Sequence, residues 1–355
     1  MRDLLNEYEQ LSATGPVGRA VVTRVWGSAP RPEGASLLAT ASGQMAGSVS
    51  GGCVEGAAAE EIKAAIASGT PRVVGWGVTH ERAWEMGLSC GGTIEVLVEP
   101  AVRPELLEAA RRPSGSVVAT VIGGDGAPVG TGLVYEESGA RRRVGALPAG
   151  LEEMIAVEAA AALPALLSRV ESLETAAGPV DVFLEVFPRR PTLLVFGGVH
   201  IATALVRMAK PLGFRTVVAD GREAFLTRER FPDADELILG WPEEVFRKVG
   251  LDAATCVCLL THDPKFDEPA LDLALRSPAC YVGAIGSRKT QAGRRERLRK
   301  AGFTPEEIAR LRGPIGLDLG GRDPAEIALA ILAEITAVRY GRAAPSSARP
   351  VETLA

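Results

Sequence analysis

The sequence has no basic excess and no long apolar run, and each absence excludes a class of protein. Lysine and arginine number 39 against 44 acidic residues, a formal charge of −5, whereas general nucleic-acid binders carry a basic balance or patch. No apolar run approaches the roughly 18–20 residues of a membrane span. The opening residues, MRDLLNEYEQ, are charged and lack the apolar core of a signal peptide, so we expect a cytoplasmic protein without a membrane span.

Cysteine is also sparse. Five cysteines in 355 residues are too few for a disulfide scaffold. The sequence contains no Cys-x-x-Cys pair, which argues against a structural zinc site. With 46% hydrophobic and 23% charged residues, the composition is that of a globular protein and excludes a wholly disordered or fibrous chain. At roughly 100–200 residues per domain, the length suggests about two domains.

Proline and arginine mark a boundary between two differently patterned halves. The segment Phe187–Pro191 holds two prolines and two arginines, which suits an exposed connection. We therefore predict domains over 1–188 and 189–342, followed by a loose Pro/Ser/Ala-rich tail over 343–355. The first half reads as a mixed α+β domain. Its expected strands lie near 18–26, 36–40, 72–78, 92–98, 116–122 and 130–135, and its main helices near 54–67 and 151–167.

The second half alternates short apolar strands with helical segments, which predicts a doubly wound parallel sheet. The strand 192–196 leads through Gly197, Gly198 and Val199 into a helix that begins near His200, and the next strand ends at Asp220. A glycine-rich turn with an acidic residue about 20 positions later is the Rossmann fingerprint for dinucleotides. Its second glycine, which lets the pyrophosphate approach, is replaced by Val199. The turn therefore either binds a nucleotide such as NAD(P) or belongs to a scaffold used for packing or for another ligand.

Two further segments follow strands of this sheet. His262, in Thr261–Asp263, either contacts a phosphate or acts as an acid or base, or it is a loop histidine bonded to Asp263. Gly286, in the turn Gly283–Lys289, belongs either to a second anion-binding turn or to an ordinary connection before a solvated helix.

The first half contains two paired glycine–cysteine turns, Gly51-Gly52-Cys53 and Cys90-Gly91-Gly92. Cys53 precedes a helix, where the dipole lowers a thiol pKa and favours a nucleophile or metal ligand. The glycines and serines of 47–52, Ser50 among them, supply the donors of an anion nest. The two thiols either share a soft metal, a sulfur or a disulfide, or are small buried hydrophobes beside tight turns.

Arg31 lies between two prolines in the loop 27–34, which holds its guanidinium at a fixed angle suited to phosphate or carboxylate. The alternative is a solvated loop arginine. The remaining cysteines, Cys256, Cys258 and Cys280, lie on or beside apolar strands and are expected to be buried, inert thiols.

Several motifs in the chain resemble the XdhC/CoxI family of xanthine dehydrogenase accessory proteins. In the first half these are GSAPRPEGASLL, GSVSGGCVEG and GLSCGGTIEVLVEP; in the second they include LLVFGGVHIATALVRMAKPLGFRTVVADGR, YVGAIGSRKT and GPIGLDLGGRDPAEIALAILAEI. The resemblance covers about Arg19 to Arg342. The family more often has glycine where this chain has Val199.

The resemblance implies a two-domain protein that binds molybdenum cofactor, supports its sulfuration by a cysteine desulfurase and delivers it to a hydroxylase of the xanthine or carbon monoxide dehydrogenase type. It implies Cys53 and Cys90 as the leading cofactor, molybdenum or sulfur contacts. Arg31, the two glycines of the first turn and Glu55 flank them. The alternatives are an NAD(P)-dependent oxidoreductase and a thiol-redox protein. A homodimer is expected because it is the commonest oligomer.

Overall fold

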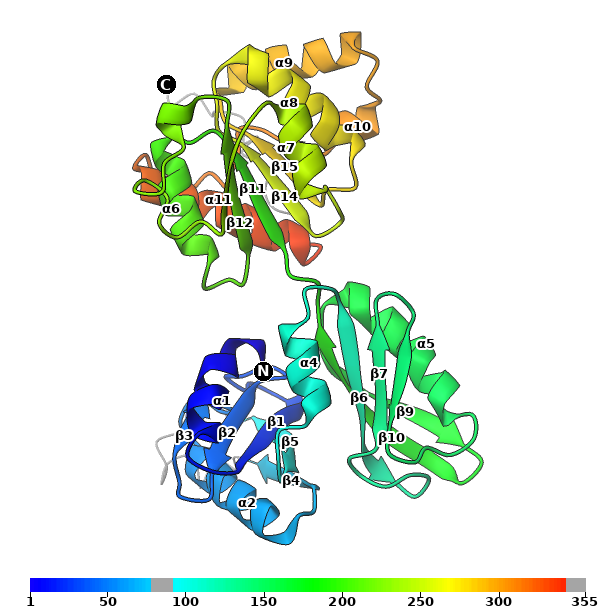
Figure 1. Ribbon diagram of the computed structural model, residues 1–355. Coiled ribbons are helices and arrows are strands. Elements are labelled where there is room, and N and C mark those ends of the chain that lie inside the picture. The colour runs from blue at the N-terminus through cyan, green and yellow to red at the C-terminus, as the bar shows by residue number, and fades with distance from the viewer. Residues whose placement is uncertain (78–91, 343–355) are drawn as a thin grey trace, which may run out of the picture. The chain divides into compact units, whose positions relative to one another are not determined.

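A computed structural model describes residues 1–77 and 92–342 (Figure 1). The chain forms two compact units, Met1–Arg189 and Arg190–Ala355. Cys90, Gly91 and the predicted tail over 343–355 lie outside the described residues. None of the helices in the described ranges is long and apolar enough to cross a bilayer.

The first unit opens with an antiparallel sheet in the order β3-β2-β1-β5-β4. Its strands are β1 (Val17–Trp26), β2 (Ser36–Thr40), β3 (Met45–Gly47), β4 (Arg72–Gly77) and β5 (Thr93–Glu99). Helix α2 (Glu55–Ser68) packs on it through Ala58, Ala59 and Ile62, and ends at Gly69 with φ +70°. The alanine-rich sequence favours a helix, and the left-handed glycine stops it.

A second antiparallel sheet completes this unit, in the order β8-β7-β6-β10-β9. Its strands are β6 (Ser116–Gly124), β7 (Gly132–Glu136), β8 (Arg141–Val144), β9 (Arg169–Thr175) and β10 (Gly178–Phe187). Helix α5 (Leu151–Ala165) buries an apolar stripe against it. The other helices of the unit are η1 (Arg2–Leu4), α1 (Leu5–Ser12) and α4 (Pro104–Arg111).

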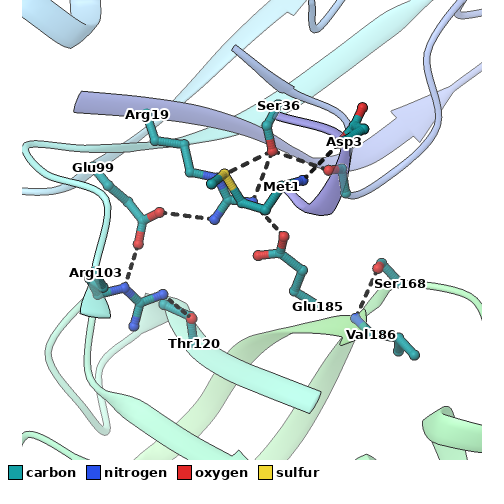
Figure 2. Close-up of polar contacts among 11 residues, drawn as sticks. Met1, Asp3, Arg19, Ser36, Glu99, Arg103, Thr120, Ser168, Glu185 and Val186 are labelled. Carbon is teal, nitrogen blue, oxygen red and sulfur yellow. Dashed lines mark hydrogen bonds and ion pairs between the residues drawn. The ribbon is translucent and has the colours of Figure 1, made fainter. Parts of the chain in front are cut away.

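The two sheets of the first unit meet through an apolar contact and a buried charge network. Val21 and Leu97 of the first sheet pack against Ile122 and Phe183 of the second. The fully buried Arg19 bridges both sheets, because its guanidinium reaches carboxylates of β5 and β10 (Figure 2).

The second unit is a parallel six-stranded sheet in the order β13-β12-β11-β14-β15-β16. Its strands are β11 (Thr192–Phe196), β12 (Arg215–Asp220), β13 (Glu236–Leu239), β14 (Thr255–Leu259), β15 (Tyr281–Ala284) and β16 (Leu311–Arg312). In chain order this is 3-2-1-4-5-6, the dinucleotide-binding topology, whose order reverses between β11 and β14.

Helices cover both faces of this sheet (Figure 1). Helices α6 (His200–Ala209) and α11 (Pro324–Arg339) share one core with it. The opposite core takes side chains from α7 (Pro242–Val249), α8 (Pro264–Arg276), α9 (Arg288–Lys300) and α10 (Pro305–Ala309). A one-turn helix, η2 (Glu223–Phe225), follows β12. The predicted doubly wound sheet after a mixed first domain is confirmed.

Candidate functional site

The loop before α2 is organised around the carboxylate of Glu55, the first residue of that helix. Its Oε1 accepts hydrogen bonds from the Ser48 hydroxyl (2.7 Å) and the Ser50 amide (2.9 Å). Its Oε2 accepts from the Ser50 hydroxyl (2.6 Å) and the Gly52 amide (2.9 Å). The donors that the sequence offered as an anion nest therefore turn toward an anion of the chain itself.

This arrangement stabilises the ionised form of Glu55. Partial burial by itself would raise the pKa of the carboxyl group, but the hydrogen bonds from Ser48 and Ser50 outweigh burial and lower it to about 2. At neutral pH the loop thus encloses a permanent negative charge near the N-terminus of α2, where the helix dipole favours it.

Ser50 fixes the position of Cys53. While its hydroxyl donates to Glu55, its oxygen accepts the backbone N–H groups of Cys53 (3.0 Å) and Val54 (2.9 Å). The turn needs φ +79° at Gly51 and φ +118° at Gly52, which glycine adopts without strain. Cys53 is half-buried against the core under α2. Its backbone is therefore held in place two residues before the helix.

The loop that carries Arg31 lies against this turn and against the start of β5. A Cβ atom at Gly51 would lie 3.5 Å from Cβ of Pro30. At Gly92 it would lie only 2.5 Å from the carbonyl oxygen of Ser28, so Gly92 must lack a side chain. The structure thus brings the loop 27–34 next to the Gly51 turn and to Gly92, the described residue of the third motif, at the end of the first sheet where β1 finishes.

Two side chains near this junction offer groups that a ligand could contact, a buried hydrogen-bond donor and an exposed aromatic ring. The Nε atom of Arg31 is buried and has no hydrogen-bond partner among the described residues. A buried donor without an acceptor costs free energy, so an incoming acceptor would be favoured there. Trp26, paired with Thr93 next to Gly92, is 50% exposed. Sequence reasoning overlooked Trp26, although its position directly before the loop 27–34 was a usable signal.

The glycine turn of the second unit is engaged with Asp220. The carboxylate is fully buried and accepts the Gly198 amide (2.8 Å), the Arg222 amide (2.9 Å) and both Nε and Nη2 of Arg222 (2.9 Å each). Burial alone would raise the pKa of Asp220, but these bonds, led by that from Arg222, lower it.

The segment after β12 lies over the same turn. A Cβ atom at Gly198 would lie 2.3 Å from the carbonyl oxygen of Phe225, and the Arg222 guanidinium stacks 3.9 Å from the centroid of the Phe225 ring. Gly197 has φ +116° and abuts Thr261. His200 is exposed at the first position of α6.

The two other predicted ligand segments lie at the same edge of the sheet. His262 is exposed after β14, while the neighbouring Asp263 accepts the Lys265 amide (3.0 Å) as the cap of α8. Gly286 has φ +136° after β15, and Ser287 caps α9. Gly197, Asp220, His262 and Gly286 thus share the carboxyl edge of the parallel strands.

The thiols of the second unit differ from the prediction at one position. Cys256 and Cys258 are buried, but Cys280 is half-buried, and its sulfur lies 3.5 Å from that of Cys256 on the neighbouring strand. The sequence hid this contact because 24 residues separate the two cysteines. Among the described residues, no group of three or more His, Cys, Asp and Glu side chains is placed to hold a metal ion.

Comparison with known proteins places both units in one family. Residues 10–77 match the XdhC and CoxI family model, and residues 193–335 match the XdhC Rossmann domain model. A probable xanthine dehydrogenase component of Bacillus subtilis is 28% identical over 327 residues, 90% of this chain and 92% of the relative. The molybdenum cofactor insertion chaperone PaoD of Escherichia coli is 27% identical over 326 residues, 91% and 84% respectively.

A solved structure extends the likeness to the whole fold. A crystal structure from Bacillus halodurans, described as a xanthine dehydrogenase, matches with a TM-score of 0.76 and 26% identity and covers 98% of both chains. Motifs, topology and both family models agree, and the chain therefore belongs to the XdhC and CoxI family.

Proposed function

We propose that this protein binds molybdenum cofactor in its first unit and delivers it to a molybdenum hydroxylase. The observation that supports the proposal is the junction of the loop 27–34 with the Gly51 turn, which precedes Cys53, and with Gly92. The Nε atom of Arg31, in the same loop, is buried and has no hydrogen-bond partner among the described residues. The name of the Escherichia coli relative, a molybdenum cofactor insertion chaperone, supports it.

The side chains at the junction match the chemical parts of the cofactor. Arg31 offers a guanidinium to the phosphate, and the exposed indole of Trp26 offers a flat surface for the pterin. Cys53 offers a thiol to molybdenum or to its terminal sulfur, and Cys90 remains a second candidate from the sequence. Gly51 and Gly52 are exposed and leave the backbone of the turn accessible, while the hydrogen bonds to Glu55 hold the loop in its conformation.

Cofactor retention tests the proposal directly. Purified protein is incubated with molybdenum cofactor, separated from free ligand and assayed for pterin and molybdenum. We expect stoichiometric retention by the native chain, and strong losses in Cys53→Ala and Arg31→Ala. Cys280→Ala, which removes a thiol from the second unit, serves as the matched control. Absence of retention by the native protein, or equal loss in the control, would refute the assignment.

The proposal extends to a sulfur donor and a recipient. We infer that a cysteine desulfurase supplies the sulfur and that a hydroxylase of the xanthine or carbon monoxide dehydrogenase type receives the cofactor from a homodimer. An apo-hydroxylase should gain activity from the loaded protein, and more when desulfurase and cysteine are included. Light scattering measures the oligomeric state. Activation that is equally fast with free cofactor would rule out delivery.

A further inference from the structure

A cleft of about 510 Å³ lies at the β16 edge of the second unit. The first helix after β15 forms one wall, and the segment around β16 forms the other. Its lining residues are Arg288, Gln291, Ala292, Arg295, Arg299, Ala309, Leu311, Arg312, Gly313, Pro314 and Glu334. Two strands, β14 and β15, separate this edge from β11, so the cleft is distinct from the glycine turn.

One face of α9 supplies most of the positive charge. Arg288, Ala292, Arg295 and Arg299 follow one another at intervals of four, three and four, which places them on the same side of a helix. The small Ala292 leaves room between the arginines. From the opposite wall Arg312 contributes a fourth guanidinium, for which the described residues provide no hydrogen-bond or ion-pair partner.

Arg295 is held in place between the two walls of the cleft. Its guanidinium donates to the carbonyl oxygens of Leu311 (3.1 Å) and Gly313 (3.3 Å) across the cleft. No carboxylate among the described residues pairs with it. Burial, together with the neighbouring Arg294 and Arg299, lowers the pKa of Arg295, so its charge is only partly compensated by its surroundings.

Elsewhere on α9 the arginines do meet carboxylates of a packed element. Arg294 lies 2.6 Å from Asp267, and Arg297 lies 2.6 Å from Glu268, both on α8. Within the described part of the chain, Glu334 is the only carboxylate that lines the cleft, and it already accepts the Tyr281 hydroxyl (2.5 Å) and the Gly316 amide (2.9 Å).

The outer arginines of the cleft form ion pairs with exposed carboxylates. Arg299 pairs with Glu296 on its own helix (2.8 Å), where both side chains are more than half exposed, and Arg288 lies 3.6 Å from Asp318. Exposed pairs of this kind contribute little. Like charges gathered in a partly enclosed space repel one another unless an anion joins them.

We propose that this cleft binds a small phosphorylated molecule of about mononucleotide size. Guanidinium groups match phosphate oxygens in geometry and charge, and the volume falls in the range of small-molecule sites, roughly 300–1,000 Å³. An acidic surface of a partner protein is the other class of occupant. A partly enclosed cleft, with Arg295 bonded across it to the opposite wall, favours the small ligand.

Calorimetric titration with inorganic pyrophosphate tests the site. We expect binding by the full-length native protein that weakens with added salt, and a dissociation constant raised at least about tenfold in Arg312→Gln and in Arg299→Gln, since each loses charge-assisted hydrogen bonds. Arg297→Gln is the matched control, because it removes the same charge from α9 outside the cleft. Thermal melting confirms that each variant is folded.

Two results would overturn the proposal. One is the absence of pyrophosphate binding by the native protein. If a polyglutamate peptide then binds, and Arg312→Gln abolishes the binding of this peptide, the cleft is a docking site for an acidic protein surface. The other is an equal loss in Arg297→Gln, which would mean unspecific attraction. Cofactor retention should be unchanged in Arg312→Gln, so failure here leaves the proposed function of the first unit intact, and the reverse also holds.

Discussion

Glu55 is the residue on which the candidate site depends most. The spacing of serines and glycines before α2 indicated an anion nest from the sequence alone. It could not show which anion fills the nest, because that depends on how the first turn of α2 folds back over the loop. The carboxylate accepts four close hydrogen bonds from three residues, and so couples the position of Cys53 to a partly buried network.

Replacing Glu55 by glutamine should loosen this loop. One acceptor oxygen becomes an amide that faces donors, which costs about 1–3 kcal/mol for the groups left unsatisfied. Denaturant unfolding at pH 7 measures the loss. Glu60→Gln on the same helix is the control, because Glu60 is 72% exposed and pairs only with Lys63 among the described residues, so its change should stay within about 0.5 kcal/mol. Equal effects of the two changes would contradict the role given to Glu55.

Acid should remove the contribution of Glu55. Because the folded-state pKa is lowered from 4.5 to about 2, its stabilising effect is complete above the unfolded-state value and is lost as pH falls toward 2. The difference in unfolding free energy between the native protein and Glu55→Gln should therefore be constant near neutrality and shrink below the ordinary carboxyl pKa of 4.5. Unfolding curves at several pH values measure this, and a difference that does not change with pH would be inconsistent with the network.

The four described thiols should react in a defined order. Cys53 and Cys280 are half-buried, and the hydrogen bond between Cys280 and Cys256 lowers the pKa of the Cys280 thiol. Burial raises the pKa of the Cys258 thiol, which leaves it protonated. Brief alkylation of the folded protein should therefore label Cys53 and Cys280 before Cys256 and Cys258, as peptide mass spectrometry reads out. Early labelling of Cys258 would contradict this order and show that the reagent reaches the core between the parallel sheet and helices α6 and α11.

At the level of elements, the sequence predicted what periodicity and length reveal. The apolar strands around 192–196, 216–219 and 255–260 alternate with helices, and the parallel sheet follows from that rhythm. It could not predict β16, which has only two residues, or β8, whose three arginines are exposed and carry no apolar alternation. Such strands form because neighbouring strands supply hydrogen bonds, which is a property of the assembled sheet.

The glycine turn and the strand after it argue against dinucleotide binding in the usual mode. A carboxylate has about four lone-pair sites, and the four donors on Asp220 occupy them. The Gly198 amide is one of those donors, and Phe225 lies against the same glycine. The prediction of a Rossmann topology from this motif is confirmed, while the ligand that its glycine turn takes stays a prediction.

We therefore expect a dissociation constant for NAD⁺ of about 1 mM or higher, which corresponds to a binding free energy of roughly −4 kcal/mol or weaker. Calorimetric titration of the full chain measures this, with NADP⁺ tested in parallel. Arg222→Ala provides a useful comparison, because it removes the two side-chain hydrogen bonds to Asp220 and leaves the bond from the backbone amide in place. Micromolar binding by the native protein would revive the oxidoreductase interpretation.

At the scale of the whole molecule, the first unit depends on a charge that the sequence hides. Arg19 occurs inside a strand-like run, where one arginine reads as a solvent-facing position. Its partners are Glu99 and Glu185, 80 and 166 residues away, and they meet it only when the two sheets pack (Figure 2). Arg103 reaches the second oxygen of Glu99 at 2.7 Å, so a second arginine joins the network.

Removing Arg19 should lower the unfolding free energy of the first unit far more than removing a neighbouring arginine. Arg19→Met leaves Glu99 and Glu185 buried without their shared cation, a loss of about 3–5 kcal/mol. Arg24→Met is the control, because Arg24 also joins the two sheets, through Glu95 and Asp181. The Arg24 side chain is 26% exposed, so water can solvate the carboxylates that lose it, and we expect a loss of only about 1 kcal/mol in unfolding free energy.

Hydrogen exchange read by peptide mass spectrometry separates the two units in this experiment. In Arg19→Met, peptides of β1, β5 and β10 should exchange faster, while those of the parallel sheet stay unchanged, because no described contact of the network involves the second unit. Adding Glu185→Gln should recover part of the loss, since it removes one uncompensated charge. If Arg19→Met and Arg24→Met cost the same, the sheets are joined by apolar packing around Phe183, and the buried ions contribute little.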